Sequence, residues 1–145
     1  MNYFHVSLIR AAAAHRKYCR QKFQVLGLTE GQPKVLTKLR GMEGCRQKDL
    51  AQACRVEPAT MTSLLKKMGQ KDLIYKEPLS LAGGKRAQGI YLTEHGRKMA
   101  DEVMEIMSEM EHVGFEGFTP GEWNEFLKLF QRVSENLEKQ VGISE

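Results

Sequence analysis

The sequence has little of what cross-linked or metal-centred proteins are built from. Its 145 residues include three cysteines, four prolines and one tryptophan. Cys19, Cys45 and Cys54 are not closely paired and lack metal-ligand spacing, and the four histidines are scattered along the chain. We therefore predict no metal site and no cofactor. Unpaired cysteines without an export signal are typical of a reducing compartment, and we expect a cytoplasmic protein.

Long apolar runs are absent as well. No stretch approaches the roughly 20 apolar residues that a membrane-spanning helix needs. Residues 1–20 have no basic lead-in, and Arg10, Arg16 and Lys17 interrupt their apolar character, unlike a signal peptide. We predict no membrane association.

Motifs of enzymes are missing too. The sequence contains no phosphate loop, no nucleophile elbow, no paired-histidine motif and no carboxylate pair on a plausible cleft. We therefore expect that the chain is not an enzyme.

The chain does have an uneven distribution of charge, although its formal net charge is only +4. Residues 34–98 carry fourteen Lys and Arg against six Asp and Glu, whereas residues 99–145 carry three against eleven. Such a division indicates a basic working surface in the middle of the chain and a C-terminal part that avoids polyanions. Chance clustering on solvated helix faces is the alternative.

Helix signals dominate the chain, which has the length of one domain. Apolar positions recur at helical spacing, and Thr29 with Gln32 and Thr119 with Glu122 form sequence patterns of capping boxes. Thr93 is expected to cap the helix that follows it. The predicted helices are 3–24, 31–40, 47–54, 58–69, 93–112 and 119–141.

Residues 47–69 read as two short helices joined by a turn. In the second helix Met61, Leu64, Leu65 and Met68 form a stripe to be buried, which leaves a polar face outside. Small hydroxyl groups near the N-terminal end of a helix and lysines further along suit insertion into the major groove of DNA. An ordinary solvated helix face is the alternative.

A hairpin is predicted next, in the stretch SLAGGKRAQGIYLT (80–93). Leu73–Tyr75 and Ile90–Leu92 are rich in strand formers, and Gly83 and Gly84 can supply the positive φ of a tight turn. Lys85 and Arg86 would then project from its tip. Taken alone this is equally a solubilising turn, but after a helix-turn-helix it indicates a winged helix whose tip arginine enters the minor groove.

In the helix-turn-helix, the hairpin and the segments beside them, the chain resembles the MarR family of bacterial transcriptional regulators. The similar runs are LTEGQPKVLTKL (28–39), QKDLAQACRVEPATMTSLLKKM (47–68), KDLIYKEP (71–78) and KRAQGIYLTEHG (85–96). The resemblance implies a mainly α fold with a winged helix-turn-helix, flanked by N- and C-terminal helices that form a dimerisation region. It further implies a homodimeric regulator, usually a repressor, that often releases DNA on binding a small hydrophobic or phenolic ligand.

The resemblance also suggests which residues would contact double-stranded DNA. Thr60, Thr62, Ser63, Lys66 and Lys67 fall at recognition-helix positions, and Arg86 matches the wing arginine. Gly84 replaces an aspartate that the family usually has near the wing tip, and Ser63 replaces a frequent arginine. Arg46 stands where a capping hydroxyl is usual, which exchanges a cap for a phosphate contact. The candidate DNA-binding residues are Arg46, Gln47, Lys48, Thr60, Thr62, Ser63, Lys66, Lys67, Lys85 and Arg86.

The terminal helices carry apolar stripes that are too rich for so small a unit to cover. Exchange of these stripes between two copies would bury Phe4, Leu8, Trp123, Phe126 and Phe130. A monomeric helical domain that uses the same residues as core is the alternative. We expect three parts: an N-terminal dimerisation helix at 1–28, a winged-helix DNA-binding domain at 29–97 and C-terminal dimerisation helices at 98–145.

Three further hypotheses stay open. Tyr18, Phe23, Met99 and Met104 could line a pocket for a small-molecule effector, although such residues more often pack a core. Cys19 lies in sequence among cations that would lower its pKa if they were close, which suggests a thiol-based redox regulator as one alternative. A winged-helix protein-interaction module without DNA affinity is the other.

Overall fold

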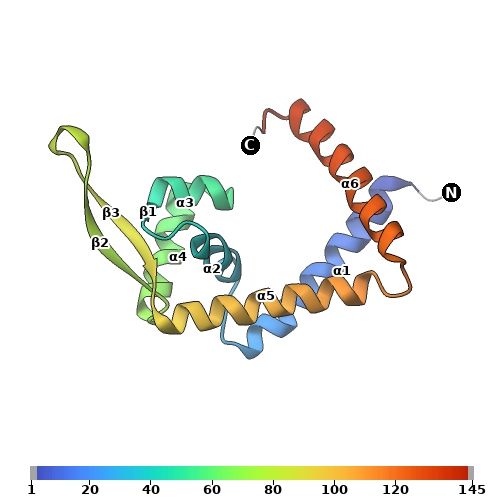
Figure 1. Ribbon diagram of the computed structural model, residues 1–145, viewed down its shortest axis with the longest axis horizontal. Coiled ribbons are helices and arrows are strands. Elements are labelled where there is room, and N and C mark those ends of the chain that lie inside the picture. The colour runs from blue at the N-terminus through green and yellow to red at the C-terminus, as the bar shows by residue number, and fades with distance from the viewer. Residues whose placement is uncertain (1–2, 144–145) are drawn as a thin grey trace. The chain divides into compact units, whose positions relative to one another are not determined.

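The computed structural model describes residues 3–143 and divides the chain into two compact units, one up to Met110 and one from Glu111. Each unit is described separately below. The predicted fold class is confirmed, because the chain is mainly helical with one small antiparallel sheet (Figure 1). The predicted boundaries after residues 28 and 97 stay a prediction.

The first unit contains five α-helices, all within a residue or two of their predicted bounds, and three strands. Residues Ala82–Gly84 add a single 3₁₀ turn between the last two strands. The elements are α1 (Phe4–Val25), α2 (Gln32–Arg40), β1 (Cys45–Arg46), α3 (Gln47–Cys54), α4 (Pro58–Gln70), β2 (Ile74–Ser80), β3 (Arg86–Leu92) and α5 (Glu94–Gly114), whose last residues belong to the second unit.

One hydrophobic core joins the elements of this unit. It is formed by the apolar faces of α2, α3, α4 and the first part of α5, and by the C-terminal end of β3. Its fully buried members include Leu36, Leu39, Leu50, Met61, Met68, Ile90 and Leu92. The predicted stripe of α4 is confirmed by this burial, with Leu64 only half-buried at its edge.

Two of the three predicted helix caps, those by Thr93 and Thr119, are confirmed. At the start of α5, Thr93 Oγ1 accepts a hydrogen bond from Gly96 N–H at 2.9 Å. The same hydroxyl donates to the backbone carbonyl of Asp72, which precedes β2. Thr119 and Glu122 exchange both bonds of a capping box at the start of α6 (Pro120–Gln140).

The capping box expected at Thr29 is only half correct. Gln32 Oε1 does accept from Thr29 N–H at 3.1 Å, but the residue that caps α2 is Gly31, at φ +87°. The amide of Gln32 donates to the backbone carbonyl of Thr29 instead of its hydroxyl, because the chain turns through Gly31 before the helix begins.

The sheet has the strand order β1-β3-β2, with both pairs antiparallel. The two long strands pair over their whole length, from Ile74 opposite Leu92 to Ser80 opposite Arg86. Both strands are longer than predicted. Their outer halves were missed because these residues are mostly exposed and show no alternation of apolar and polar side chains. The two-residue strand β1 pairs Cys45 with Ile90 and was not predicted.

The second unit consists of the end of α5 and α6. Phe115 stacks on Trp123, with ring centroids 4.6 Å apart, and Phe126 stacks on Phe130 at 5.7 Å. No residue of α6 is buried. Among residues 3–143, no helix is long and apolar enough to cross a membrane.

Candidate nucleic-acid interface

The polar face of α4 is fully presented to the outside of the first unit. Its five residues, which we call the reading face, are all exposed, while Met61, Leu65 and Met68 on the opposite side are buried. Pro58 opens the helix at a position where its missing N–H costs nothing. The reading face consists of Thr60, Thr62, Ser63, Lys66 and Lys67.

The first residue of α3 contacts this face directly. Gln47 Nε2 donates to Thr62 Oγ1 at 2.7 Å, and Thr62 Oγ1 in turn donates to the carbonyl of Pro58 at 3.1 Å. The helix-turn-helix therefore holds one of its own reading-face hydroxyls in a defined orientation. Nothing in the spacing of Gln47 and Thr62 could have predicted the contact.

The other two predicted residues near α3 behave differently from each other. Arg46 is the N-cap residue of α3 and makes no side-chain cap, as expected, but its Nε pairs with Asp49 Oδ2 at 3.1 Å. Lys48 is exposed. A phosphate contact by Arg46 would therefore compete with Asp49.

The hairpin forms the predicted wing, which extends away from the helices (Figure 1). Gly83 and Gly84 adopt φ of +81° and +75°, the left-handed conformation that the turn requires. Lys85 and Arg86 are exposed at the tip. The rings of Tyr75 and Tyr91 stack across the two strands, with their centroids 5.4 Å apart, and this cross-strand pair stabilises the base of the wing.

The predicted cations of this surface are largely free of acidic partners. Within residues 3–143, five of the six form neither an ion pair nor a side-chain hydrogen bond, in contrast to Arg46. Unpaired cations remain available to neutralise phosphates without first breaking a contact. The five are Lys48, Lys66, Lys67, Lys85 and Arg86.

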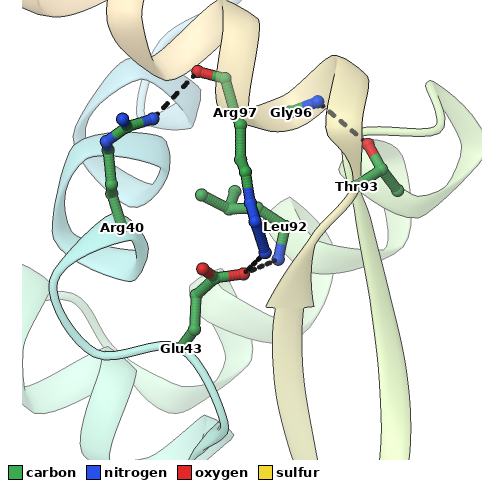
Figure 2. Close-up of polar contacts among 6 residues, drawn as sticks. All are labelled: Arg40, Glu43, Leu92, Thr93, Gly96 and Arg97. Atoms are coloured by element: carbon green, nitrogen blue, oxygen red, sulfur yellow. Dashed lines mark hydrogen bonds and ion pairs between the residues drawn. The ribbon is translucent and has the colours of Figure 1, made fainter.

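A group of polar contacts fixes the base of the wing to α5 (Figure 2). Glu43, in the loop before β1, accepts from Leu92 N–H at 2.9 Å and from Arg97 Nη2 at 2.8 Å. Arg40 donates to the carbonyl of Arg97 and pairs with Asp101 at 2.9 Å. We call these contacts the wing-base joint. The sequence could not predict them, because the hydrogen-bonded partners lie 49 to 57 residues apart in the chain.

The four candidate pocket residues are spread between the core and the surface. Met99 is buried in the core, and Phe23 packs against it. Tyr18 is half-buried on α1, while Met104 is 52% exposed. The hypothesis of an effector pocket stays a prediction.

The lowered thiol pKa suggested for Cys19 is wrong. Cys19 is buried on α1, and this burial is the cause that raises the pKa of its thiol. Its Sγ lies 3.7 Å from His15 Nε2. Burial likewise raises the pKa of Cys45 and Cys54. Within residues 3–143, no cluster of His, Cys, Asp and Glu could hold a metal ion.

The arrangement of α3, α4 and the hairpin defines a winged helix-turn-helix protein. Comparison with known proteins shows which family it is similar to. The MarR family model matches residues 28–80. An uncharacterized HTH-type transcriptional regulator of Bacillus subtilis, YybA, is 28% identical over 118 residues, which cover 81% of this chain and 77% of that protein.

Solved structures agree on the fold over nearly the whole chain. The transcriptional regulator SlyA superposes with a TM-score of 0.81 at 21% identity, with 96% of each chain covered. A putative MarR family transcriptional regulator from Listeria monocytogenes, solved with a 26mer DNA, gives 0.79 at 21% identity, with 100% and 99% covered. The resemblance to the MarR family is thereby confirmed over residues 28–80, and the fold of these solved regulators is shared over nearly the whole chain. The members of this family are transcriptional regulators and not enzymes.

Proposed function

We propose that this chain is a homodimeric, sequence-specific DNA-binding repressor that works in the cytoplasm and is relieved by a small hydrophobic or phenolic ligand. The observation that carries DNA binding is the exposed reading face of α4 beside a wing whose tip cations, Lys85 and Arg86, have no acidic partner. The Listeria relative, whose name states a complex with 26mer DNA, supports the same use of the fold.

The proposed mode of binding follows from this surface. The reading face of α4 enters the major groove, where its small side chains approach base edges and its lysines neutralise phosphates. Lys48 and Arg46 contact the backbone beside it, and Arg86 reaches the adjacent minor groove. Two copies of α4 are needed to read two half-sites about one helical turn apart.

Apolar residues left exposed on the terminal helices support the homodimer. On α1, Phe4 and Ile9 are 48% and 64% exposed, and on α6 Leu127 and Leu137 are 47% and 54% exposed. Burial of the exposed part of each such side chain against a second copy is worth about half of the 1.5–3 kcal/mol of a full burial, so several of them together support a stable dimer. The ligand and the sign of regulation rest on the family resemblance alone.

Duplex affinity measured against salt concentration tests the proposal. A phosphate-tracking dimer should lose affinity steeply as salt rises, with a slope of about one logarithmic unit per contacted phosphate. A flat slope with no duplex affinity at modest salt would favour the protein-interaction module. A reporter gene under the bound promoter, with and without phenolic compounds, then tests repression and its relief.

A redox regulator is the remaining candidate, and the buried thiol of Cys19 argues against it. A raised pKa leaves little thiolate at neutral pH, and the thiolate is the reactive form. The Cys19→Ala variant should therefore keep the DNA affinity of the wild type both before and after peroxide treatment. Loss of peroxide sensitivity in this variant alone would restore the redox hypothesis.

A further inference from the structure

The hydroxyl group of Thr62 is already engaged inside the protein. Its proton is donated to the carbonyl of Pro58 at 3.1 Å, and one of its lone pairs accepts from Gln47 Nε2 at 2.7 Å. A hydroxyl has one proton and two lone pairs, so a single acceptor position remains. Thr62 nevertheless lies on the exposed reading face, in the second turn of α4.

The other two hydroxyls of the reading face are not engaged in hydrogen bonds within the described residues. Thr60 and Ser63 have no hydrogen-bond partner among residues 3–143, so they keep both their donor and their acceptors. Purines offer the acceptor N7 to the major groove, and thymine offers the acceptor O4 together with its C5-methyl group. Thr62 has no proton left for N7 or O4. Its side chain still offers a base two things: one acceptor position, which suits the amino group of adenine or cytosine, and the γ-methyl group, which suits the C5-methyl of thymine.

We propose that Thr62 recognises a thymine in each half-site through contact between its γ-methyl and the C5-methyl of the base. Gln47 is the positioning residue that, with the Pro58 carbonyl, holds the hydroxyl away from the base. This inference rests on the proposed DNA-binding function. It divides the reading face into an apolar reader, Thr62, and two polar readers, Thr60 and Ser63.

The test begins with duplexes that the wild-type protein selects from a random library. Each thymine of a selected duplex is replaced in turn by uracil, which differs only in lacking the C5-methyl, and the affinity is measured by fluorescence anisotropy. We expect one replacement per half-site to weaken binding about fourfold, the value of one buried methyl group. Thr62→Val, which keeps the methyl and loses the hydroxyl, should retain this sensitivity. Thr62→Ser, which keeps the hydroxyl and loses the methyl, should abolish it.

Ser63→Ala is the comparison variant, because it removes the free hydroxyl of a polar reader: its overall affinity should fall, while the ratio of its affinities for the thymine and uracil duplexes should equal that of the wild type. The proposal is overturned if no uracil replacement weakens binding, if Thr62→Ser keeps the sensitivity, or if Thr62→Val loses it. Failure to select any duplex would instead overturn the proposed DNA-binding function, and this inference with it. Because the uracil scan of the wild type needs no variant, it stays decisive even if a variant proves unstable.

Discussion

At the scale of single residues, Arg86 is one of the two cations at the wing tip. It is exposed and has no acidic partner among residues 3–143. Arg86→Ala should weaken binding about tenfold to duplexes with AT-rich flanks, whose narrow minor groove attracts arginine, and less to GC-rich ones. Anisotropy titrations measure both.

Lys76→Ala, which removes an exposed cation further down the same hairpin, is the control for a general loss of charge. Both variants should melt at the wild-type temperature. An unchanged affinity of Arg86→Ala for AT-rich flanks would contradict the role assigned to the wing.

Glu43 is the central residue of the wing-base joint. Its side chain, only 25% exposed, accepts from the amide of the buried Leu92 and from Arg97. Glu43→Ala should lower the free energy of unfolding by about 1–3 kcal/mol, because it leaves a buried amide without an acceptor. Urea denaturation followed by circular dichroism measures the loss.

Asp101→Ala serves as the comparison, since Asp101 also pairs with an arginine of the joint but is 57% exposed. An exposed pair of this kind is worth about 0–1 kcal/mol. Equal losses in the two variants would show that Glu43 does not hold the joint together.

At the scale of elements, two helical glycines should respond to alanine in opposite directions. Gly96 in the first turn of α5 lies so close to the Leu73 carbonyl that a Cβ would collide with it, whereas a Cβ at Gly69 in α4 meets nothing within 4 Å. Gly69→Ala should stabilise the protein by about 0.5–1 kcal/mol through helix propensity. Gly96→Ala should destabilise it by about 1–3 kcal/mol, because α5 must move away from the backbone of Leu73.

Thermal melts of the two variants provide the measurement, and each serves as the control for the other. Stabilisation by Gly96→Ala would mean that the close packing of α5 on Leu73 is not maintained in solution.

We expect the two lysines in the C-terminal part of α4 to support non-specific affinity for DNA. The double variant Lys66→Ala with Lys67→Ala should bind all duplexes more weakly by a similar factor. Its salt slope should flatten by about two units, one for each phosphate contact removed. Lys128→Ala with Lys139→Ala removes the same charge from α6 and should leave the slope nearly unchanged. A loss confined to one sequence would instead assign base readout to Lys66 or Lys67.

At the scale of the whole molecule, the exposed apolar residues of α6 predict that assembly and DNA binding are coupled. Leu127→Asp places a charge on this surface, at a side chain that is 47% exposed in the single chain. We expect a monomer by analytical ultracentrifugation and a large loss of affinity for a two-half-site duplex, because only one reading helix remains. Asn124→Asp adds the same charge on the polar face of α6 and should stay dimeric. A Leu127→Asp variant that remains dimeric would move the interface away from α6.

Sequence reasoning succeeded where a structure depends on residues close together in the chain. The bounds of α4, the cap by Thr93 and the positive φ of Gly83 and Gly84 each follow from patterns only a few residues long. It failed where the partner lies elsewhere. The strand β1 is too short to have a periodicity, and it is defined only by its pairing with Gly89 and Ile90, more than 40 residues further on.

The amino-acid sequence by itself determined the helices, the turn glycines and the placement of cations, because helix propensity, capping and charge are local properties. Only the tertiary structure decided which groups remain free to act. It buried Cys19 and raised the pKa of its thiol, paired Arg46 with Asp49, and engaged the hydroxyl of Thr62 with Gln47. These outcomes depend on burial and on contacts across helices, and neither is encoded at any fixed spacing along the chain.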